Sequence, residues 1–209
     1  MPTFFYEDQH DGLVVGLDEA GCGPWAGPVV AGAAVIDRLS FPNDLLTTMT
    51  DSKKMSASQR EKVIQAIAVY EGHLCFTAVG MASVEEIDRL NIRAAGILAM
   101  ERAFKALALP SQPSFALVDG TVKPQLSCPS LSLKKGDSLS YSVALASIVA
   151  KVTRDHLMKE LAAVYPAYGW EKNAGYGTAG HRQALADYGV TPHHRRSFAP
   201  IAALINEAA

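Results

Sequence analysis

Short apolar runs separated by glycine and turn residues predict five β-strands in this chain. Two of them, GLVVGLD at 12–18 and VVAGAAVI at 29–36, stand on either side of a Gly/Pro-rich turn. Their spacing predicts a hairpin, and the first run indicates a buried strand that ends in an acid. The other three runs are LCFTAVG at 74–80, FALVDG at 115–120 and LSLKKGD at 131–137.

Helical patterns alternate with the strand-like runs. Segments 56–70 and 83–90 both begin with a serine followed three residues later by Gln or Glu, which is the capping-box pattern. Segment 91–109 is apolar around most of its circumference, which predicts burial on several sides. Segment 140–165 predicts a long helix with two faces. Its apolar face carries Leu145, Ile148, Val149 and Val152, and its polar face carries Ser147, Lys151 and Arg154.

Composition and charge are those of an ordinary globular protein. The 209 residues are 49% hydrophobic and 19% charged, with no linker or repeat, so we expect a single domain over 1–209. A net charge of −2 means that any binding of nucleic acid depends on local basic patches. The longest apolar run is too short to span a membrane, and three cysteines without a CxxC pair favour a reduced, cytoplasmic setting.

Four acids share one kind of position, at the end of an apolar run and beside a glycine. They are Asp18, Glu19, Asp119 and Asp137. Any one of them could instead cap a turn or a helix. Strand ends from one sheet edge can converge, and gathered carboxylates would repel one another unless a cation lay between them. Because carboxylate oxygens are hard ligands, the pattern predicts a site for Mg²⁺ or Mn²⁺ and disfavours zinc.

The glycines of GCGPWAG at 21–27 suggest a phosphate-binding loop as an alternative. A dinucleotide-binding loop opens a helix, whereas this segment continues into a strand-like run and loses donors at Pro24 and Pro28. Asp18 and Glu19 would also repel a phosphate that carries no metal. A nucleotide loop is therefore disfavoured, and the chain has no GxxxxGK(S/T) motif.

Several motifs together resemble those of bacterial ribonuclease HII, a type 2 ribonuclease H. The resemblance covers nearly the whole chain, and the motifs occur in the family's order, which makes it specific. The matching segments are LDEAGCGPWAGPVVAGAAVI at 17–36, DSKKMS at 51–56, VDG at 118–120, KKGDSLSYSVALASIVAKVTRD at 134–155, GYGT at 175–178 and HHRRSF at 193–198.

The resemblance implies an α/β, ribonuclease H-like fold: a mixed sheet flanked by helices, with a helical C-terminal region from about 165 to 209. It implies hydrolysis of RNA in RNA/DNA hybrids and nicking 5′ of single ribonucleotides in duplex DNA, leaving 5′-phosphate and 3′-hydroxyl ends. It implies two divalent ions, Mg²⁺ or Mn²⁺, and a monomer without a membrane partner. The four implied catalytic and metal-binding residues are Asp18, Glu19, Asp119 and Asp137.

The resemblance also implies a turn that recognises the ribose at an RNA–DNA junction. Its residues are Gly21, Cys22 and Gly23, with Tyr176 stacking on a sugar or base. Cys22 stands where the family has arginine, so the chain lacks a cation at this position. No base is apparent that could activate Cys22 as a nucleophile, and the two-metal mechanism needs none.

Basic residues complete the expected substrate contacts. Lys53 and Lys54 are predicted to bind phosphates, with a solvated surface pair as the alternative. Lys151 and Arg154 are also predicted to contact substrate, although Lys151 could instead pair with Asp155 four residues on. HHRRSF either contacts nucleic acid or ties the C-terminal region to the body of the protein.

Two other functions remain as alternatives. One is another two-metal nuclease of the same fold, which the DSKK and GYGT motifs disfavour. The other is a non-catalytic module that binds nucleic acid. Such a module would gain nothing from four acids, because carboxylates without metal weaken phosphate binding.

Overall fold

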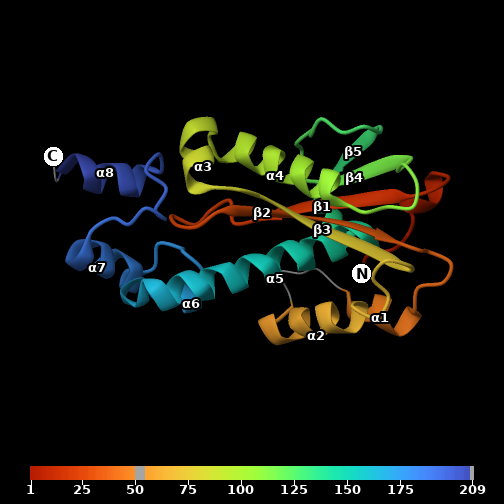
Figure 1. Cartoon of the computed structure of the whole chain (residues 1–209), viewed down its shortest axis with the longest axis horizontal. Helices are drawn as coiled ribbons and strands as arrows, with labels where there is room; N and C mark the ends of the chain where they lie inside the picture. Colours follow the sequence, from red (N-terminus) through yellow and green to blue (C-terminus); the bar gives the residue numbers. More distant parts are fainter. Residues whose placement is uncertain (50–54, 208–209) are drawn as a thin grey trace.

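A mixed β-sheet forms the centre of the protein. The computed structural model describes residues 1–49 and 55–207, and these contain a five-stranded sheet in the order β3-β2-β1-β4-β5 (Figure 1). The strands are β1 (Val14–Ala20), β2 (Val29–Ile36), β3 (Cys75–Ala82), β4 (Phe115–Asp119) and β5 (Ser130–Leu133). β2 pairs antiparallel with β1 and with β3, whereas β4 pairs parallel with β1 and with β5. The predicted hairpin of the first two strands is confirmed.

Eight α-helices lie within the described residues. They are α1 (Asn43–Thr48), α2 (Ala57–Ile67), α3 (Val84–Leu90), α4 (Ile92–Ala106), α5 (Tyr141–Val164), α6 (Trp170–Asn173), α7 (Ala179–Tyr188) and α8 (Ala199–Glu207). Both predicted capping boxes are present, with Ser56 and Gln59 at α2 and Ser83 and Glu86 at α3. None of these helices is long and apolar enough to cross a membrane.

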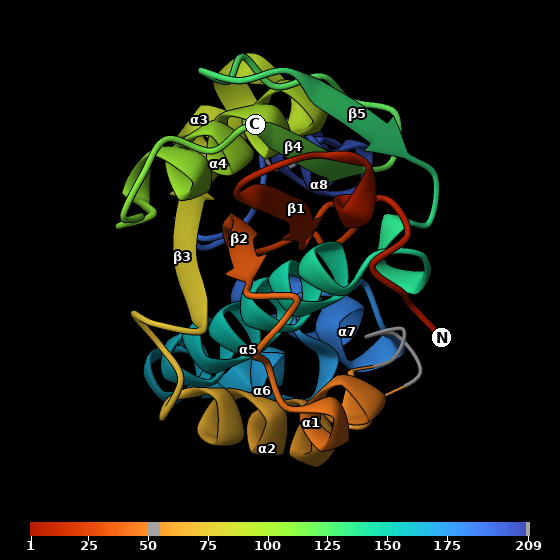
Figure 2. The same cartoon turned by 90° about the vertical axis from the view of Figure 1, so that its right-hand side faces the viewer.

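The helices form layers on both faces of the sheet. Figure 2 shows the order from one side to the other: α4, the sheet, α5, and then α1 and α2. Leu17 of β1 belongs to the buried cluster that includes Met100 of α4, whereas Ile148 of α5 belongs to a second cluster with Val63 of α2. α5 is therefore the central helix, covered by the sheet and by α2.

Helix α4 differs from its predicted environment. Its buried residues, Ala95, Gly96, Ala99, Met100 and Ala103, form one stripe that faces the sheet. Arg93 and Lys105 are exposed on the other side. The prediction of burial on several sides was wrong because no further layer covers this helix within the described residues.

Close packing of β1 against α5 sets the position of the acidic strand end. Val15 and Leu17 point toward α4, so strand alternation directs Gly16 and Asp18 toward α5. A Cβ on Gly16 would lie 2.1 Å from the carbonyl carbon of Ser142, so only glycine allows the helix to approach this closely. Asp18, two residues on, is thereby held against the same helix.

The C-terminal helices gather around the far end of α5. α6, α7 and α8 lie together beyond the sheet (Figure 1), which confirms the predicted helical C-terminal region. Their buried side chains include Trp170, Leu185 and Ile201, and they share one cluster with Ala26 and Met158. Because Ala26 belongs to the turn after β1, this cluster ties the C-terminal region to the Gly/Pro-rich turn.

Candidate active site

Asp18 and Asp119 are neighbours at one end of the sheet. The parallel register pairs Leu17 of β1 with Val118 of β4, so the next residue of each strand brings the two carboxylates side by side. Asp18 is only 3% exposed. Two carboxylates from strands that are far apart in sequence therefore lie together at the ends of β1 and β4.

The surroundings of Asp18 oppose its negative charge. Burial, and then the carboxylates of Asp119 and Glu19, raise the pKa of Asp18 well above its ordinary value. A hydrogen bond from the Ser147 hydroxyl and one of 2.7 Å from the backbone N–H of Glu19 act in the opposite direction. The two hydrogen bonds do not offset all of the repulsion between the carboxylates, and a bound cation would reduce what remains.

Asp137 lies in a tight turn rather than at the end of a strand. β5 ends at Leu133, Lys135 adopts a left-handed conformation with φ of 60°, and Gly136–Ser138 form a 3-10 turn. The prediction of a strand through 137 was wrong, because the left-handed residue turns the chain out of the sheet. The N–H of Gly136 donates to Oδ1 of Asp119 at 2.6 Å. Asp137 is the next residue in the chain and is 2% exposed.

Glu19 is directed to the opposite face of the sheet from Asp18. Strand alternation requires this, and the Cγ of Glu19 lies 3.9 Å from where a Cβ on Gly96 of α4 would stand. Its Oε1 accepts a hydrogen bond from the Cys22 thiol at 3.5 Å. Glu19 is thus placed between the sheet end and the turn that follows β1.

The described residues do not form a ready-made metal site. Within 1–49 and 55–207, no three His, Cys, Asp or Glu side chains are arranged so that they could hold an ion among themselves. The carboxylate donors nevertheless fit Mg²⁺ or Mn²⁺, since Mg²⁺ commonly binds through one or two carboxylates, water and substrate phosphate. Asp18 and Asp119 are the pair that the structure itself brings together.

Cys22 is not arranged as a nucleophile. Its sulfur donates to Glu19, although part of the residue is exposed. Desolvation of the sulfur, and then the Glu19 carboxylate, raise the pKa of Cys22 to about 12. The thiol therefore stays protonated near neutral pH, which agrees with its rejection as a nucleophile on sequence grounds.

The 21–23 turn and Tyr176 lie against each other. Gly21 has φ of +99°, and a Cβ there would lie 2.0 Å from Nε of Arg154, so the position requires glycine. A Cβ on Gly23 would lie 3.2 Å from the Tyr176 ring. Tyr176 is 52% exposed and presents its ring to solvent beside the turn. The predicted ribose-recognition residues are thus in one place, next to the acids.

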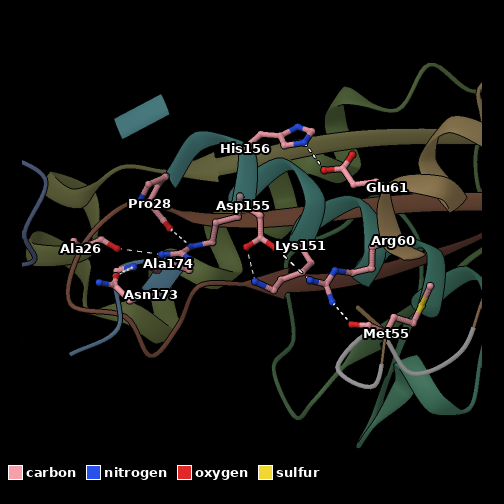
Figure 3. A network of polar contacts seen from close by, with 12 residues as sticks. Ala26, Pro28, Met55, Arg60, Glu61, Lys151, Asp155, His156, Asn173 and Ala174 are labelled. Atoms are coloured by element: carbon pink, nitrogen blue, oxygen red, sulfur yellow. Dashed lines mark hydrogen bonds and ion pairs between the residues drawn. The ribbon is translucent and has the colours of Figure 1, made fainter. Parts of the chain in front are cut away.

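Arg154 holds protein backbone, which corrects its predicted role as a substrate contact. It is 1% exposed, and its nitrogens donate to the carbonyls of Pro28, Ala26 and Ala174 at 3.0–3.1 Å. Figure 3 shows these three residues around one end of the polar network. A guanidinium buried among carbonyls is not available to a phosphate, so Arg154 acts by fixing the turn after β1 to the C-terminal region.

Lys151 takes part in an ion-pair network at the other end of Figure 3. Its Nζ lies 2.5 Å from Oδ1 of Asp155, which is the i,i+4 pair considered as an alternative. Oδ2 of Asp155 lies 3.3 Å from Arg60, and Arg60 donates to the carbonyl of Met55 at 2.6 Å. About a third of the Lys151 side chain remains exposed, so substrate contact by Lys151 stays a prediction. Lys53 and Lys54 lie outside the described residues.

Arg195 is the important residue of this site that sequence reasoning did not single out. It lies in the HHRRSF motif and is fully buried, with four backbone carbonyls of the Gly21–Pro28 loop as acceptors. The next residues are tied to α3, because the N–H groups of Arg196 and Ser197 donate to Asp88. Of the two roles considered for HHRRSF, attachment of the C-terminal region is the one that Arg195 performs.

Comparison with known proteins shows the family of this chain. The family model described as Ribonuclease HII matches residues 15–201, from β1 to the start of α8. The chain belongs to the ribonuclease HII family. It is 52% identical over 205 residues to a ribonuclease HII of Jannaschia sp. (strain CCS1), covering 98% of both chains. It is 50% identical over 210 residues to one of Gluconobacter oxydans, covering 100% of this chain and 99% of the relative.

Solved structures confirm the ribonuclease H-like fold. The ribonuclease H2 of Pyrococcus horikoshii OT3 superposes with a TM-score of 0.76 at 25% identity, over 94% of this chain and 98% of that one. A Bst-RNase HIII solved in complex with Mn²⁺ has a TM-score of 0.76 at 20% identity, over 100% of this chain and 74% of that one, and shows the fold alone. As a member of the ribonuclease HII family, this protein is an endoribonuclease, a hydrolase of phosphodiester bonds.

Proposed function

We propose that this protein is a metal-dependent endonuclease that cuts RNA in RNA/DNA hybrids and nicks duplex DNA 5′ of an embedded ribonucleotide. The observation that supports this most is the placement of the buried Asp18 and the half-buried Asp119 as neighbours beside the 21–23 turn and Tyr176. One end of this arrangement suits a cation and a scissile phosphate. The other offers backbone groups and an aromatic ring to the neighbouring sugar.

Two divalent ions, Mg²⁺ or Mn²⁺, would be held by Asp18, Glu19, Asp119 and Asp137. When bound, such ions supply a water of lowered pKa and neutralise charge that develops on the leaving oxygen. The protein's own part is to orient the carboxylates. The Ser147 hydroxyl holds Asp18, and the Gly136 N–H holds Asp119 at 2.6 Å. The products would carry 5′-phosphate and 3′-hydroxyl ends.

Recognition of the ribose belongs to the turn and to Tyr176. The 2′-hydroxyl is the group that distinguishes RNA from DNA at a given nucleotide, and it can both donate and accept a hydrogen bond. The exposed backbone of Cys22 and Gly23 can approach it closely, while the Tyr176 ring can stack on the sugar or base. One chain carries all of these residues, so the proposed activity requires no second copy.

Cleavage of a duplex that carries one ribonucleotide tests the proposed function. With Mn²⁺ or Mg²⁺ we expect one nick, on the 5′ side of the ribonucleotide, and with excess chelator we expect none. The products are resolved on a denaturing gel with each strand end-labelled in turn. An all-DNA duplex of the same sequence is the control, and a long RNA/DNA hybrid tests the second substrate.

Two results would contradict the proposal. Unchanged cleavage in the presence of chelator would show that the activity does not require a metal ion. Equal cutting of the all-DNA duplex would favour the alternative of a general two-metal nuclease, because a ribose-recognising site must discriminate against deoxyribose.

Replacement of Cys22 by arginine tests the effect of its departure from the family. Position 22 is exposed and lies next to Glu19, so a guanidinium has room to reach solvent and a substrate phosphate. We expect Cys22→Arg to lower KM for the single-ribonucleotide duplex several-fold and to steepen its salt dependence by about one phosphate contact. Cys22→Gln, which adds length without charge, should leave the salt dependence unchanged. A KM for Cys22→Arg equal to that of the parent protein would show that the missing arginine carries no direct cost.

A further inference from the structure

Arg195 is a buried cation at the centre of the Gly21–Pro28 loop. Its Nη2 donates to the carbonyl of Gly21 at 2.6 Å and its Nη1 to the carbonyl of Cys22 at 3.1 Å. The same side chain reaches the carbonyls of Gly27 at 3.0 Å and Pro28 at 3.3 Å. One guanidinium therefore binds both ends of the loop, including two of the three residues of the 21–23 turn.

These contacts fix the direction of the amide groups in the turn. In a trans peptide the C=O and the following N–H point in opposite directions within one plane, and the described residues contain no cis peptide. Because the carbonyls of Gly21 and Cys22 point at Arg195, the N–H groups of Cys22 and Gly23 point away from it. Within residues 1–49 and 55–207, no hydrogen bond uses either N–H as its donor.

The side away from Arg195 is the open side of the turn. Cys22 and Gly23 are exposed, and the half-exposed ring of Tyr176 stands beside Gly23. The two N–H groups are thus presented where Tyr176 meets solvent. A hydroxyl placed there would find donors already oriented, without the cost of ordering the turn.

Arg195 itself is held in place independently of the turn. Its own N–H donates to the carbonyl of Trp25 at 2.8 Å, and its guanidinium lies 5.0 Å from the centre of the Phe198 ring. The following residues are attached to Asp88 of α3 by hydrogen bonds of 2.9–3.0 Å. The cation is therefore a fixed point against which the turn is positioned.

Arginine suits this position for a geometric reason. Its planar fork distributes donors over several directions, whereas a lysine ammonium is a compact point charge that cannot reach four separated carbonyls in the same way. Burial, and then the nearby Arg154, lower the pKa of Arg195. The guanidinium nevertheless remains protonated near neutral pH, so all its donors are retained.

We propose that Arg195 is a positioning residue for ribose recognition: by holding the carbonyls of Gly21 and Cys22, it aims the N–H groups of Cys22 and Gly23 at the substrate's 2′-hydroxyl. This inference rests on the proposed function, because it assigns the turn's amides to the ribose of that substrate. It adds a residue from the C-terminal region that acts only through the backbone of the turn.

The affinity ratio between a duplex with one ribonucleotide and the same all-DNA duplex tests this role. Both affinities are measured by fluorescence anisotropy in an Asp119→Asn background, which keeps the duplex intact. We expect Arg195→Gln to lower the ratio about tenfold or more, because two oriented donors to the hydroxyl are lost. Affinity for the all-DNA duplex should hardly change, since it has no 2′-hydroxyl. Arg195→Lys should restore part of the ratio.

Arg38→Gln is the matched control for general loss of stability. Arg38 also donates to backbone carbonyls, those of Glu7 and His10, but it lies on segments remote from the turn. Its replacement should lower the melting temperature and leave the ratio unchanged. If Arg195→Gln does not fold, Arg195→Lys decides by the same measurement.

The inference is overturned if folded Arg195→Gln keeps the parent ratio, if Arg195→Lys keeps it where the glutamine variant does not fold, or if Arg38→Gln lowers the ratio equally. A parent protein without any preference for the ribonucleotide duplex would overturn the proposed function and this inference with it. A parent preference that survives in both Arg195 variants would overturn the inference alone.

Discussion

Asp119→Asn is expected to reduce cleavage by about 10³-fold or more while leaving the fold intact. The substitution removes one of the two charges that meet at the ends of β1 and β4, and with it a ligand for the proposed ions. The hydrogen bond from the Gly136 N–H to Oδ1 can persist, because an amide oxygen also accepts. The pKa of Asp18 should fall toward its ordinary value, since Asp119 is one of the groups that raise it.

Turnover on the single-ribonucleotide duplex and a thermal melt check this result together. Asp37→Asn is the matched control, because Asp37 likewise accepts from a backbone N–H, that of Leu39 at 3.0 Å, but follows β2 away from the site. We expect the control to keep normal turnover. Near-normal turnover in Asp119→Asn would instead show that this carboxylate does not bind the catalytic ions.

Gly16→Ala is expected to destabilise the protein by about 3 kcal/mol or more. The added Cβ would lie 2.1 Å from the carbonyl carbon of Ser142 and 2.3 Å from the backbone nitrogen of Val143. A flexible side chain could move aside, but these are backbone atoms in the first turn of a 24-residue helix. Relief therefore requires β1 and α5 to separate, which would also pull Asp18 away from Ser147.

Urea denaturation gives the change in the free energy of unfolding, and cleavage measured at low temperature gives the effect on the site. Gly180→Ala is the matched control, since a Cβ at Gly180 would meet nothing within 4 Å and the residue lies in the first turn of α7. That change should stabilise the protein slightly, by about 0.5–1 kcal/mol. Equal stability of the two variants would contradict the close packing of β1 on α5.

Local sequence signals predicted most of the individual elements. β2 has the predicted bounds, and the serines at 56 and 83 cap helices through the expected side-chain bonds. These features depend on a short continuous apolar run or on residues three positions apart, so they can be recognised without the rest of the chain. The turn at Gly136–Ser138 could not, because the left-handed conformation of Lys135 has no glycine to signal it.

The roles of the polar side chains were harder to predict from the sequence than the helices and strands. Asp18 and Asp119 were recognised as candidates from their motifs, whereas Arg154 was assigned to substrate from its charge and its place on the polar face of the 140–165 helix. Whether a cation faces solvent or backbone depends on which carbonyls the fold brings to it. For Arg195 those carbonyls belong to residues 167 to 174 positions earlier in the chain.

The sequence by itself determined the family, the order of the acidic motifs and the main strands and helices, because each is encoded in residue types at short spacing. Only the tertiary structure decided that Asp18 meets Asp119, that Asp137 lies in a turn, and that two arginines bind backbone carbonyls. These outcomes depend on local backbone conformation and on contacts between distant segments. The sequence does not distinguish a buried arginine from an exposed one, because burial depends on the assembled fold.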